Sequence, residues 1–237
     1  MRILVLDIIN SPFEEDKQLE HVKECLKRSG ADISDFEFRE NIIYKDSVDF
    51  ELLKWADKVI AGGSMHSVYE DGLFWKDDLR RAYDQIIQRE IPMHTICFGT
   101  QFLAFHLGEK VHKNPNGHEF GSVEIFLTDD GKKHEGINFI EGKLVHSTHS
   151  DCIEKVPKEA NLLAFNENTE VQAFQFRNIL ATQFHTDLPT EAMERIMGMR
   201  KERDRINIRD AEHEREIFEG LKLGEGSWEI LRKWASV

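Results

Sequence analysis

Short apolar runs alternate with amphipathic helical stretches through the first hundred residues, and this alternation limits the folds open to the chain. Residues 2–9 are β-branched and apolar and end at Asn10, a pattern that predicts a central strand followed by a loop. A repeated order of strand and helix favours a parallel sheet built of βαβ units. The other expected strands lie at 36–38, 57–61 and 92–96, and the expected helices at 19–28, 52–55, 74–89 and 101–107. We therefore predict an α/β fold of the flavodoxin-like type, with an open, mostly parallel sheet and helices on both faces.

The second half of the chain changes to a pattern dominated by strands. These strands are expected to extend or cover one edge of the sheet, and they lie at 122–127, 143–147, 161–165, 170–176 and 179–184. Pro189 then opens a long helix through Arg200. Residues 210–234 predict two more helices, split at 224–226. We expect residues 1–190 to form the α/β domain and residues 191–237 a helical extension packed on it.

Charge and cysteine content exclude several classes of protein. The formal net charge of −13 argues against a nucleic acid or an anionic membrane as the main partner. The apolar run at residues 1–9 is too short to cross a bilayer and is not followed by a small-residue cleavage site. The three cysteines show no CxxC spacing, so neither a disulfide framework nor a zinc site is predicted. We expect a cytoplasmic protein with no metal and no cofactor.

A candidate nucleophile lies between a predicted strand and a predicted helix. Cys97 follows the apolar run directly, and Gly99 comes two residues later, as in a nucleophile elbow. The N-terminus of the following helix favours a thiolate, and its backbone N–H groups can receive an oxyanion. A buried cysteine that packs like a small apolar residue is the structural alternative.

A candidate base and a carboxylate follow the last predicted strand. His185 can take the thiol proton and later protonate a leaving amine, and Asp187 can hold the other ring nitrogen. The chain has 11 histidines, so a structural histidine at a strand end is the alternative. Glycines at 62–63 follow another buried strand and would let the backbone approach a ligand closely. The N–H groups of Gly63 and Phe98 are the predicted oxyanion hole, although a plain glycine turn would look the same.

Taken together, these segments resemble the class I glutamine amidotransferases of the triad type, and in particular their GMP-synthase-like branch. The resemblance covers residues 59–187 and is carried by residues 63–71 (GSMHSVYED), 96–101 (ICFGTQ), 114–121 (NPNGHEFG), 149–151 (HSD) and 183–187 (QFHTD). Three positions depart from the family pattern: Thr95 replaces a glycine, Thr186 a proline and Asp187 a glutamate. Asp187 is one methylene shorter than the family residue, so its part in the triad is the open point.

The resemblance implies an activity and a substrate site. Cys97 would attack the side-chain amide of glutamine, release ammonia and leave a γ-glutamyl thioester for water to hydrolyse. Gln101 and the backbone of Ser147 and Thr148 match positions that hold the amino-acid end of glutamine in the family. The ammonia acceptor would be a separate protein, such as a synthetase subunit, or would be absent, because too little chain follows Asp187 to form a synthetase domain.

Two alternatives to this activity stay open. The first is a γ-glutamyl peptide hydrolase, which would need a wider cavity mouth around residues 66–71. The second is a catalytically silent relative that binds or regulates, and the sequence feature that supports it is Asp187 in place of the family glutamate.

Other residues receive structural interpretations. Cys25 is expected in the core, Cys152 is expected to be partly buried, and the charged run 200–209 is expected to form a solvated helix face and loop. Trp228, Ile230, Leu231 and Trp234 are expected to pack a helix, with any exposed part available to a second copy or a partner.

Overall fold

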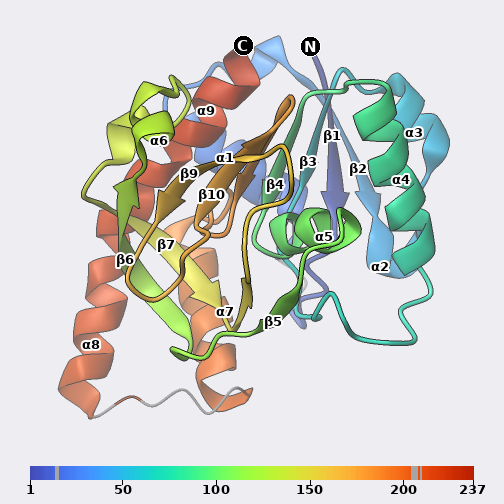
Figure 1. The fold of residues 1–237 in the computed structure, drawn as a ribbon. Coiled ribbons are helices and arrows are strands. Elements are labelled where there is room, and N and C mark those ends of the chain that lie inside the picture. Colours follow the sequence, from blue (N-terminus) through green and yellow to red (C-terminus); the bar gives the residue numbers. More distant parts are fainter. Residues whose placement is uncertain (14–15, 204–207, 209) are drawn as a thin grey trace.

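The computed structural model describes residues 1–13, 16–203, 208 and 210–237. Its strands are β1 (Arg2–Asp7), β2 (Glu37–Ile42), β3 (Lys58–Ala61), β4 (Met93–Ile96), β5 (Val111–Lys113), β6 (Glu119–Leu127), β7 (Lys143–His149), β8 (Asp151–Ile153), β9 (Asn161–Phe165), β10 (Ala173–Phe176) and β11 (Ile179–Thr182). The main sheet has the strand order β2-β1-β3-β4-β11-β10-β9-β6-β7, and β5 pairs with β8 beside it (Figure 1). This is the predicted mixed α/β sheet.

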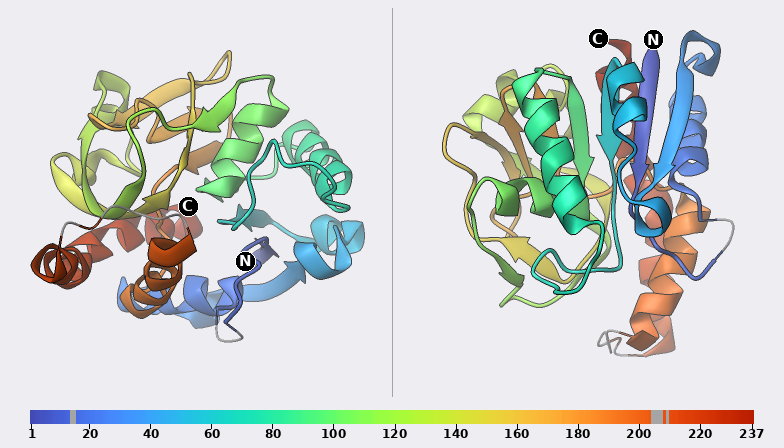
Figure 2. Two further views of the ribbon diagram at one scale, coloured as in Figure 1. Left: turned by 90° about the horizontal axis from the view of Figure 1, so that it is seen from below. Right: turned by 90° about the vertical axis from the view of Figure 1, so that its right-hand side faces the viewer.

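The helices cover both faces of this sheet. They are α1 (Gln18–Arg28), α2 (Ile43–Asp46), α3 (Phe50–Trp55), α4 (Lys76–Gln88), α5 (Phe98–His106), α6 (Asp129–Lys133), α7 (Thr190–Arg203), α8 (Ala211–Glu219) and α9 (Trp228–Ser236), with 3₁₀ turns at Ile33–Asp35, Asn138–Ile140 and Gly220–Ser227. Figure 2 shows α4 and α5 on one face and α1 and α9 on the other. Among the described residues, no helix is both long enough and apolar enough to cross a membrane.

The parallel part of the sheet explains where the two candidate loops meet. Strands β2, β1, β3, β4 and β11 are paired in parallel, so their carboxyl ends lie at one edge. β1 is buried on both faces: Leu4 and Leu6 pack with the helices of one face, and Ile3 and Val5 pack with α1 and α9 on the other. Because β3 and β4 are neighbours, the loops that follow them are brought together.

The second half extends this sheet through antiparallel pairs. β10 pairs with β11, β9 with β10, β6 with β9 and β7 with β6, all antiparallel. The prediction that these strands lengthen one edge is therefore confirmed. The sequence patterns missed the short elements β5, β8, α2 and α6, and they placed the start of α5 at 101 instead of Phe98.

The C-terminal helices pack against the sheet and against α1. Trp228 and Leu231 of α9 are buried with the core between α1 and the sheet, and Ile230 is buried with the antiparallel strands, as predicted. α7 lies lower, at the carboxyl edge of the parallel strands (Figure 1).

The charged run at 200–209 is a correction. Arg200 is only 7% exposed, so the run does not begin on a solvated helix face. Residues 204–207 and 209 lie outside the described residues.

Candidate active site

Cys97 occupies a sharp turn between β4 and α5. Its backbone has φ 52° and ψ −107°, in the left-handed half of conformational space, which is costly for a residue with a Cβ. Its N–H donates to the carbonyl oxygen of Thr182 at 2.8 Å, which ties the turn to β11. Gly99 permits the turn, because a Cβ there would lie 2.3 Å from the carbonyl oxygen of Ala61. Cys97 is therefore held at the N-terminal end of α5, at the edge of a cavity.

His185 and Asp187 lie beside this turn. The N–H of His185 donates to the carbonyl oxygen of His146 at 2.8 Å, and its ring Nδ1 lies 3.0 Å from Oδ1 of Asp187. Burial opposes the charged ring, but the nearby Cys97 and Asp187 outweigh it and raise the pKa of His185 to about 10. A Cβ built on Gly63 would lie 3.0 Å from Cε1 of His185 and 3.8 Å from Cβ of Cys97. The structure thus brings together the residues of three separate loops.

Asp187 is held by a second partner that sequence patterns did not reveal. Nε2 of Gln18, the first residue of α1, donates to Oδ2 of Asp187 at 2.8 Å. Burial would raise the pKa of Asp187, but its bonds to His185 and Gln18 keep it below the usual value. Gly62 leaves room for this contact, because a Cβ there would overlap the Gln18 side chain. Both carboxylate oxygens are therefore fixed despite the short side chain.

Thr186, which stands where the family has proline, anchors the same turn. His94 lies in β4 with Nδ1 2.9 Å from the carbonyl oxygen of Leu180, so Nδ1 carries the proton and donates. Burial lowers the pKa of His94 to about 4, so the ring is neutral and Nε2 is an acceptor. The Thr186 hydroxyl lies 2.8 Å from this nitrogen and donates to it. The hydrogen bond from Thr186 to His94 fixes the backbone between His185 and Asp187 against β4.

The residues of the predicted oxyanion hole, Gly63 and Phe98, lie at the cavity beside Cys97. In the described part of the chain no group accepts a hydrogen bond from either N–H. Gly99 N–H donates to the carbonyl oxygen of Gly62 at 3.0 Å, which locks the β3 and β4 loops in their relative position. An oxyanion hole formed by these two amides therefore stays a prediction.

Gln101 lies on the first turns of α5 and also lines the cavity. Its Nε2 donates to the carbonyl oxygen of Asp151 at 3.0 Å and to Oε1 of Gln183 at 3.1 Å. Because both amide hydrogens are used and no described residue donates to Oε1, this oxygen is available to a ligand. An acceptor of this kind suits an ammonium group.

The predicted pair Ser147 and Thr148 divides between two environments. Thr148 lines the cavity, whereas Ser147 is fully buried and its hydroxyl donates to Oε2 of Glu119 at 2.9 Å. The same oxygen accepts from Nε2 of His149 at 2.8 Å and from Nε2 of Gln172 at 2.7 Å. Burial acts against the Glu119 carboxylate, but these bonds, that from His149 above all, lower its pKa to about 2. This network supports β7 from behind and was not predicted.

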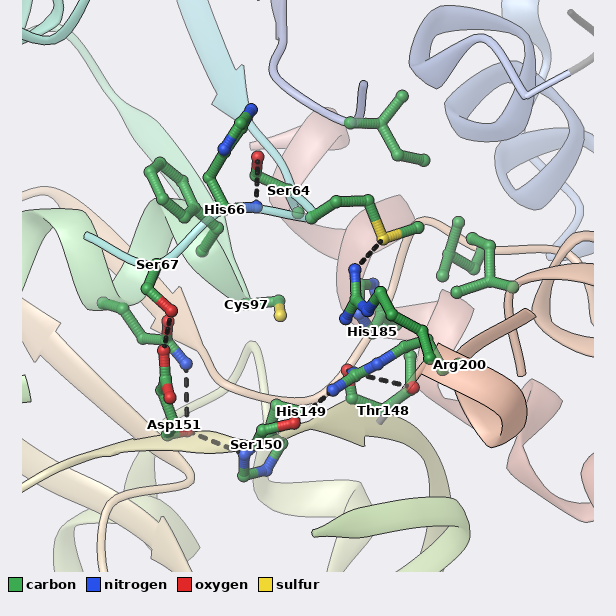
Figure 3. Close-up of a pocket in the computed structure, with 18 of the residues that line it drawn as sticks. Ser64, His66, Ser67, Cys97, Thr148, His149, Ser150, Asp151, His185 and Arg200 are labelled. Atoms are coloured by element: carbon green, nitrogen blue, oxygen red, sulfur yellow. Dashed lines mark hydrogen bonds between the residues drawn. The ribbon is translucent and has the colours of Figure 1, made fainter. Parts of the chain in front are cut away.

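The cavity has a volume of about 80 Å³, is open on one side and is lined by residues from several elements. Figure 3 shows Cys97 near its centre, with Ser64, His66 and Ser67 on one side and the segment from Thr148 to Asp151 on another. Arg200 enters from α7, next to His185 and Thr148 (Figure 3). Sequence patterns missed Arg200, which lies in a run of charged residues that resembles a solvated surface.

The other two cysteines do not line this cavity. Cys25 and Cys152 are buried, and burial raises the pKa of both thiols. Cys152 was expected to be only partly buried. Within the described ranges, no group of three or more His, Cys, Asp or Glu side chains is arranged to hold a metal ion.

Comparison with known proteins places this fold and cavity in a family. Residues 17–200 match the family model described as glutamine amidotransferase class-I. A GMP synthase (glutamine-hydrolyzing) of Brachyspira hyodysenteriae is 31% identical over 146 residues, which are 60% of this chain and 26% of that protein. This chain therefore spans about a quarter of the length of that relative.

Two further known proteins align with this chain over a larger share of their own length. The Saccharomyces cerevisiae protein named "Putative glutamine amidotransferase YLR126C" is 27% identical over 178 residues, 71% of this chain and 69% of that protein. The crystal structure of a glutamine amidotransferase from Thermotoga maritima superposes with a TM-score of 0.76 at 21% identity and covers 100% of this chain and 99% of that one. With 184 of its 237 residues matched by the family model (17 to 200 inclusive), this chain belongs to the class-I glutamine amidotransferase family.

Proposed function

We propose that this protein hydrolyses the side-chain amide of glutamine to glutamate and ammonia, with Cys97 as nucleophile, His185 as acid and base, and Asp187 as the residue that orients His185. The observation that supports this most is the convergence of three loops on one cavity. Cys97 on its strained turn, the His185–Asp187 pair at 3.0 Å and the unbonded amides of Gly63 and Phe98 all border it.

The first half of the reaction forms a thioester. His185, whose pKa is raised to about 10, carries a proton at neutral pH, and the Cys97 sulfur is the attacking nucleophile. The sulfur bonds to the γ-carbonyl carbon, and the C=O electron pair moves onto oxygen, which the N–H groups of Gly63 and Phe98 stabilise. When the carbonyl re-forms, the C–N bond breaks and His185 gives its proton to the leaving nitrogen. Ammonia and a γ-glutamyl thioester result.

The second half returns the enzyme to its starting state. His185, now neutral, takes a proton from a water molecule as its oxygen attacks the thioester carbon. The C–S bond breaks, glutamate is released and the thiolate is restored beside the imidazolium. Asp187 keeps Nδ1 protonated throughout, so that Nε2 serves both steps.

Contacts at the mouth of the cavity favour free glutamine over γ-glutamyl peptides. A peptide leaving group would need space beside residues 66–71, and this segment is bonded to the cavity wall. The Ser67 hydroxyl and the Tyr69 hydroxyl donate to Asp151 at 2.6 and 2.9 Å, and His66 lies 3.1 Å from Nδ2 of Asn10. These contacts hold residues 66–71 against the cavity wall and leave less room there for a peptide leaving group.

The ammonia would be passed to a separate synthetase subunit. The GMP synthase of Brachyspira hyodysenteriae aligns with this chain over 26% of its own length, and the rest of that protein lies outside the alignment. We propose that a second polypeptide supplies the acceptor reaction, and that residues 1–190 form the glutaminase domain with residues 191–237 as its helical extension.

The test is release of glutamate from glutamine and, separately, from γ-glutamyl dipeptides, with Cys97→Ala as control. We expect release from glutamine that is lost in the variant. Release from the dipeptides alone would assign the protein as a γ-glutamyl peptide hydrolase. If neither substrate is turned over and Cys97 is alkylated no faster than Cys25, the assignment of the nucleophile is wrong and the binding or regulatory alternative is favoured.

A further inference from the structure

Arg200 connects the C-terminal helices to the cavity. It lies near the end of α7, at the last residue that the family model matches, and it lines the same cavity as Cys97. Only 7% of the residue is exposed, which is rare for arginine and requires bonded partners. The buried positive charge of Arg200 beside this cavity suggests that the residue acts in the substrate site.

The backbone of α7 is anchored, so the position of Arg200 is determined by the fold. Met193, Ile196 and Met197 on the buried face of the helix pack with Ile9 and Leu188. On its other side, Arg195 bonds to Oδ1 of Asp16 through two guanidinium nitrogens, at 2.5 and 3.2 Å. The helix therefore presents Arg200 to the cavity as a rigid element, without help from a loop.

The guanidinium contacts the strand that forms the cavity floor. Its Nη1 donates to the carbonyl oxygen of Thr148 and, at 2.9 Å, to the Thr148 hydroxyl, while Nη2 donates to the Ser150 hydroxyl. Ser150 is itself held by Nδ1 of His118 at 2.6 Å. Figure 3 shows the side chain crossing from α7 to this segment, directly beside the cavity. Arg200 thus fixes the backbone after Ser147 and brings a permanent positive charge to it.

This position is on the part of the wall where the amino-acid end of a substrate would lie. Gln101 provides an acceptor suited to the ammonium group, so the carboxylate attached to the same carbon must lie within a few ångströms of that point. Thr148 and Arg200 line the same cavity as Gln101. At a separation of a few ångströms, a buried cation attracts an anion far more strongly inside a protein than it does in water.

We propose that Arg200 is a positioning and specificity residue that the C-terminal helices supply to the substrate site. It holds Thr148 and Ser150 in place and favours the α-carboxylate of glutamine. This inference rests on the proposed glutaminase activity, and it makes α7 part of the substrate site as well as part of the packing.

The first experiment pairs a variant with a change in the substrate. Arg200→Met, Arg200→Lys and the wild type are assayed with L-glutamine and with L-glutaminamide, in which an amide replaces the α-carboxylate; the γ-hydrolysis products glutamate and isoglutamine are quantified separately. Loss of a bond to a charged group predicts a 10- to 100-fold fall in kcat/KM for glutamine in Arg200→Met, mainly through KM. The value for glutaminamide should change less than about threefold, and Arg200→Lys should recover part of the loss. An equal fall for both substrates, or no fall, would overturn the proposal.

A second readout does not depend on glutaminase activity. Cys97 is alkylated with iodoacetate, which is anionic, and with iodoacetamide, which is neutral and of similar size. We expect the ratio of the two rates to fall at least about fivefold in Arg200→Met, because the cation that attracts the anionic reagent is gone. The matched control is Lys201→Met, which removes a charge one residue away on α7, where Lys201 pairs with Glu214 at 2.8 Å.

The two readouts separate failure of this proposal from failure of the proposed function. A wild type that turns over neither amide, with a ratio that falls only in Arg200→Met, would reject the glutaminase and keep Arg200 as an anion-selecting residue. A ratio that is unchanged in Arg200→Met, or that falls equally in Lys201→Met, would overturn the role of Arg200 whatever the activity. Thermal melts of each variant show that it is folded.

Discussion

Substitution of Asp187 by asparagine tests the most unusual feature of the site, an aspartate in a position where the family has glutamate. Asn has almost the same size but no charge, and it can turn its amide NH₂ toward His185. Asp187 is 1% exposed and bonds to His185 at 3.0 Å and to Gln18 at 2.8 Å, so solvent cannot replace the lost carboxylate. The change therefore acts directly on the charge state and tautomer of His185.

The size of the effect follows from the pKa of His185. Burial lowers this pKa, while Cys97 and Asp187 together raise it from 6.5 to about 10. The net difference corresponds to about 5 kcal/mol in favour of the imidazolium. Loss of a hydrogen bond to a charged group removes about 2 kcal/mol of this, so the pKa should fall by about 1 to 2. Because the asparagine amide can also favour the wrong tautomer of the His185 ring, we expect the kcat of Asp187→Asn to fall about 10²- to 10⁴-fold.

Two measurements check this prediction. NMR titration of the His185 ring should show an imidazolium that persists to about pH 10 in the wild type and loses its proton at lower pH in Asp187→Asn. The stability that this raised pKa contributes is complete below pH 6.5 and is lost as the pH rises through about 10, so the contribution of His185 should make the two proteins differ most in unfolding free energy just below pH 6.5 and progressively less above it. Asp187→Glu keeps the charge and is the control. Two results in Asp187→Asn would together refute the reasoning: a kcat within about threefold of the wild type, and a His185 pKa within about 0.3 of the wild type, margins of roughly the measurement error.

Three further substitutions test the framework around the site. Gly99→Ala should destabilise the fold by about 1–3 kcal/mol in denaturant titrations, because a Cβ would lie 2.3 Å from a strand carbonyl, whereas Gly198→Ala in α7 meets open space and should be neutral or stabilising. Burial raises the pKa of Asp7 to about 6, so its ionised form costs about 3 kcal/mol at pH 7.5. Asp7→Asn should therefore stabilise the protein at pH 7.5 by about 1–3 kcal/mol, and this gain should vanish near pH 4; a gain of equal size at pH 4 would refute the burial argument. Thr186→Val leaves the buried Nε2 of His94 without its donor and should cost about 1–3 kcal/mol in unfolding free energy and slow glutamate release, whereas unchanged values of both would show that the bond does not hold the turn.

Periodic and strongly local patterns predicted most of the fold. The buried strands, the amphipathic helices and the elbow at Cys97 each have a signature within a few residues, so they could be placed without knowledge of the partners. Cys97 and His185 lie at the same edge because β4 and β11 are parallel neighbours, a pairing that the sequence patterns did not predict. The short elements β5 and β8 escaped because three-residue strands carry no measurable period.

The residues that support the site were harder to predict because their role depends on distant contacts. Gln18 reaches Asp187 across 169 positions of sequence, and nothing in the local sequence of α1 distinguishes it from a surface glutamine. Arg200 lies in a charged run, and charge alone favours exposure until the helix is placed against the cavity. Thr186 was visible as a departure from the family pattern, but its partner His94 could be found only from the register of β4 and β11.

The central claim is that Cys97 carries the γ-glutamyl group during turnover. It is tested by mixing the protein with glutamine, quenching in acid within milliseconds to seconds, and locating the modified peptide by mass spectrometry, with hydroxylamine in a parallel reaction to trap the thioester as a hydroxamate. The account predicts a transient γ-glutamyl adduct on Cys97 that is absent in Cys97→Ala and accumulates in variants slowed in hydrolysis. Glutamine hydrolysis without an adduct on Cys97, or with the adduct on Cys25 or Cys152, would contradict it.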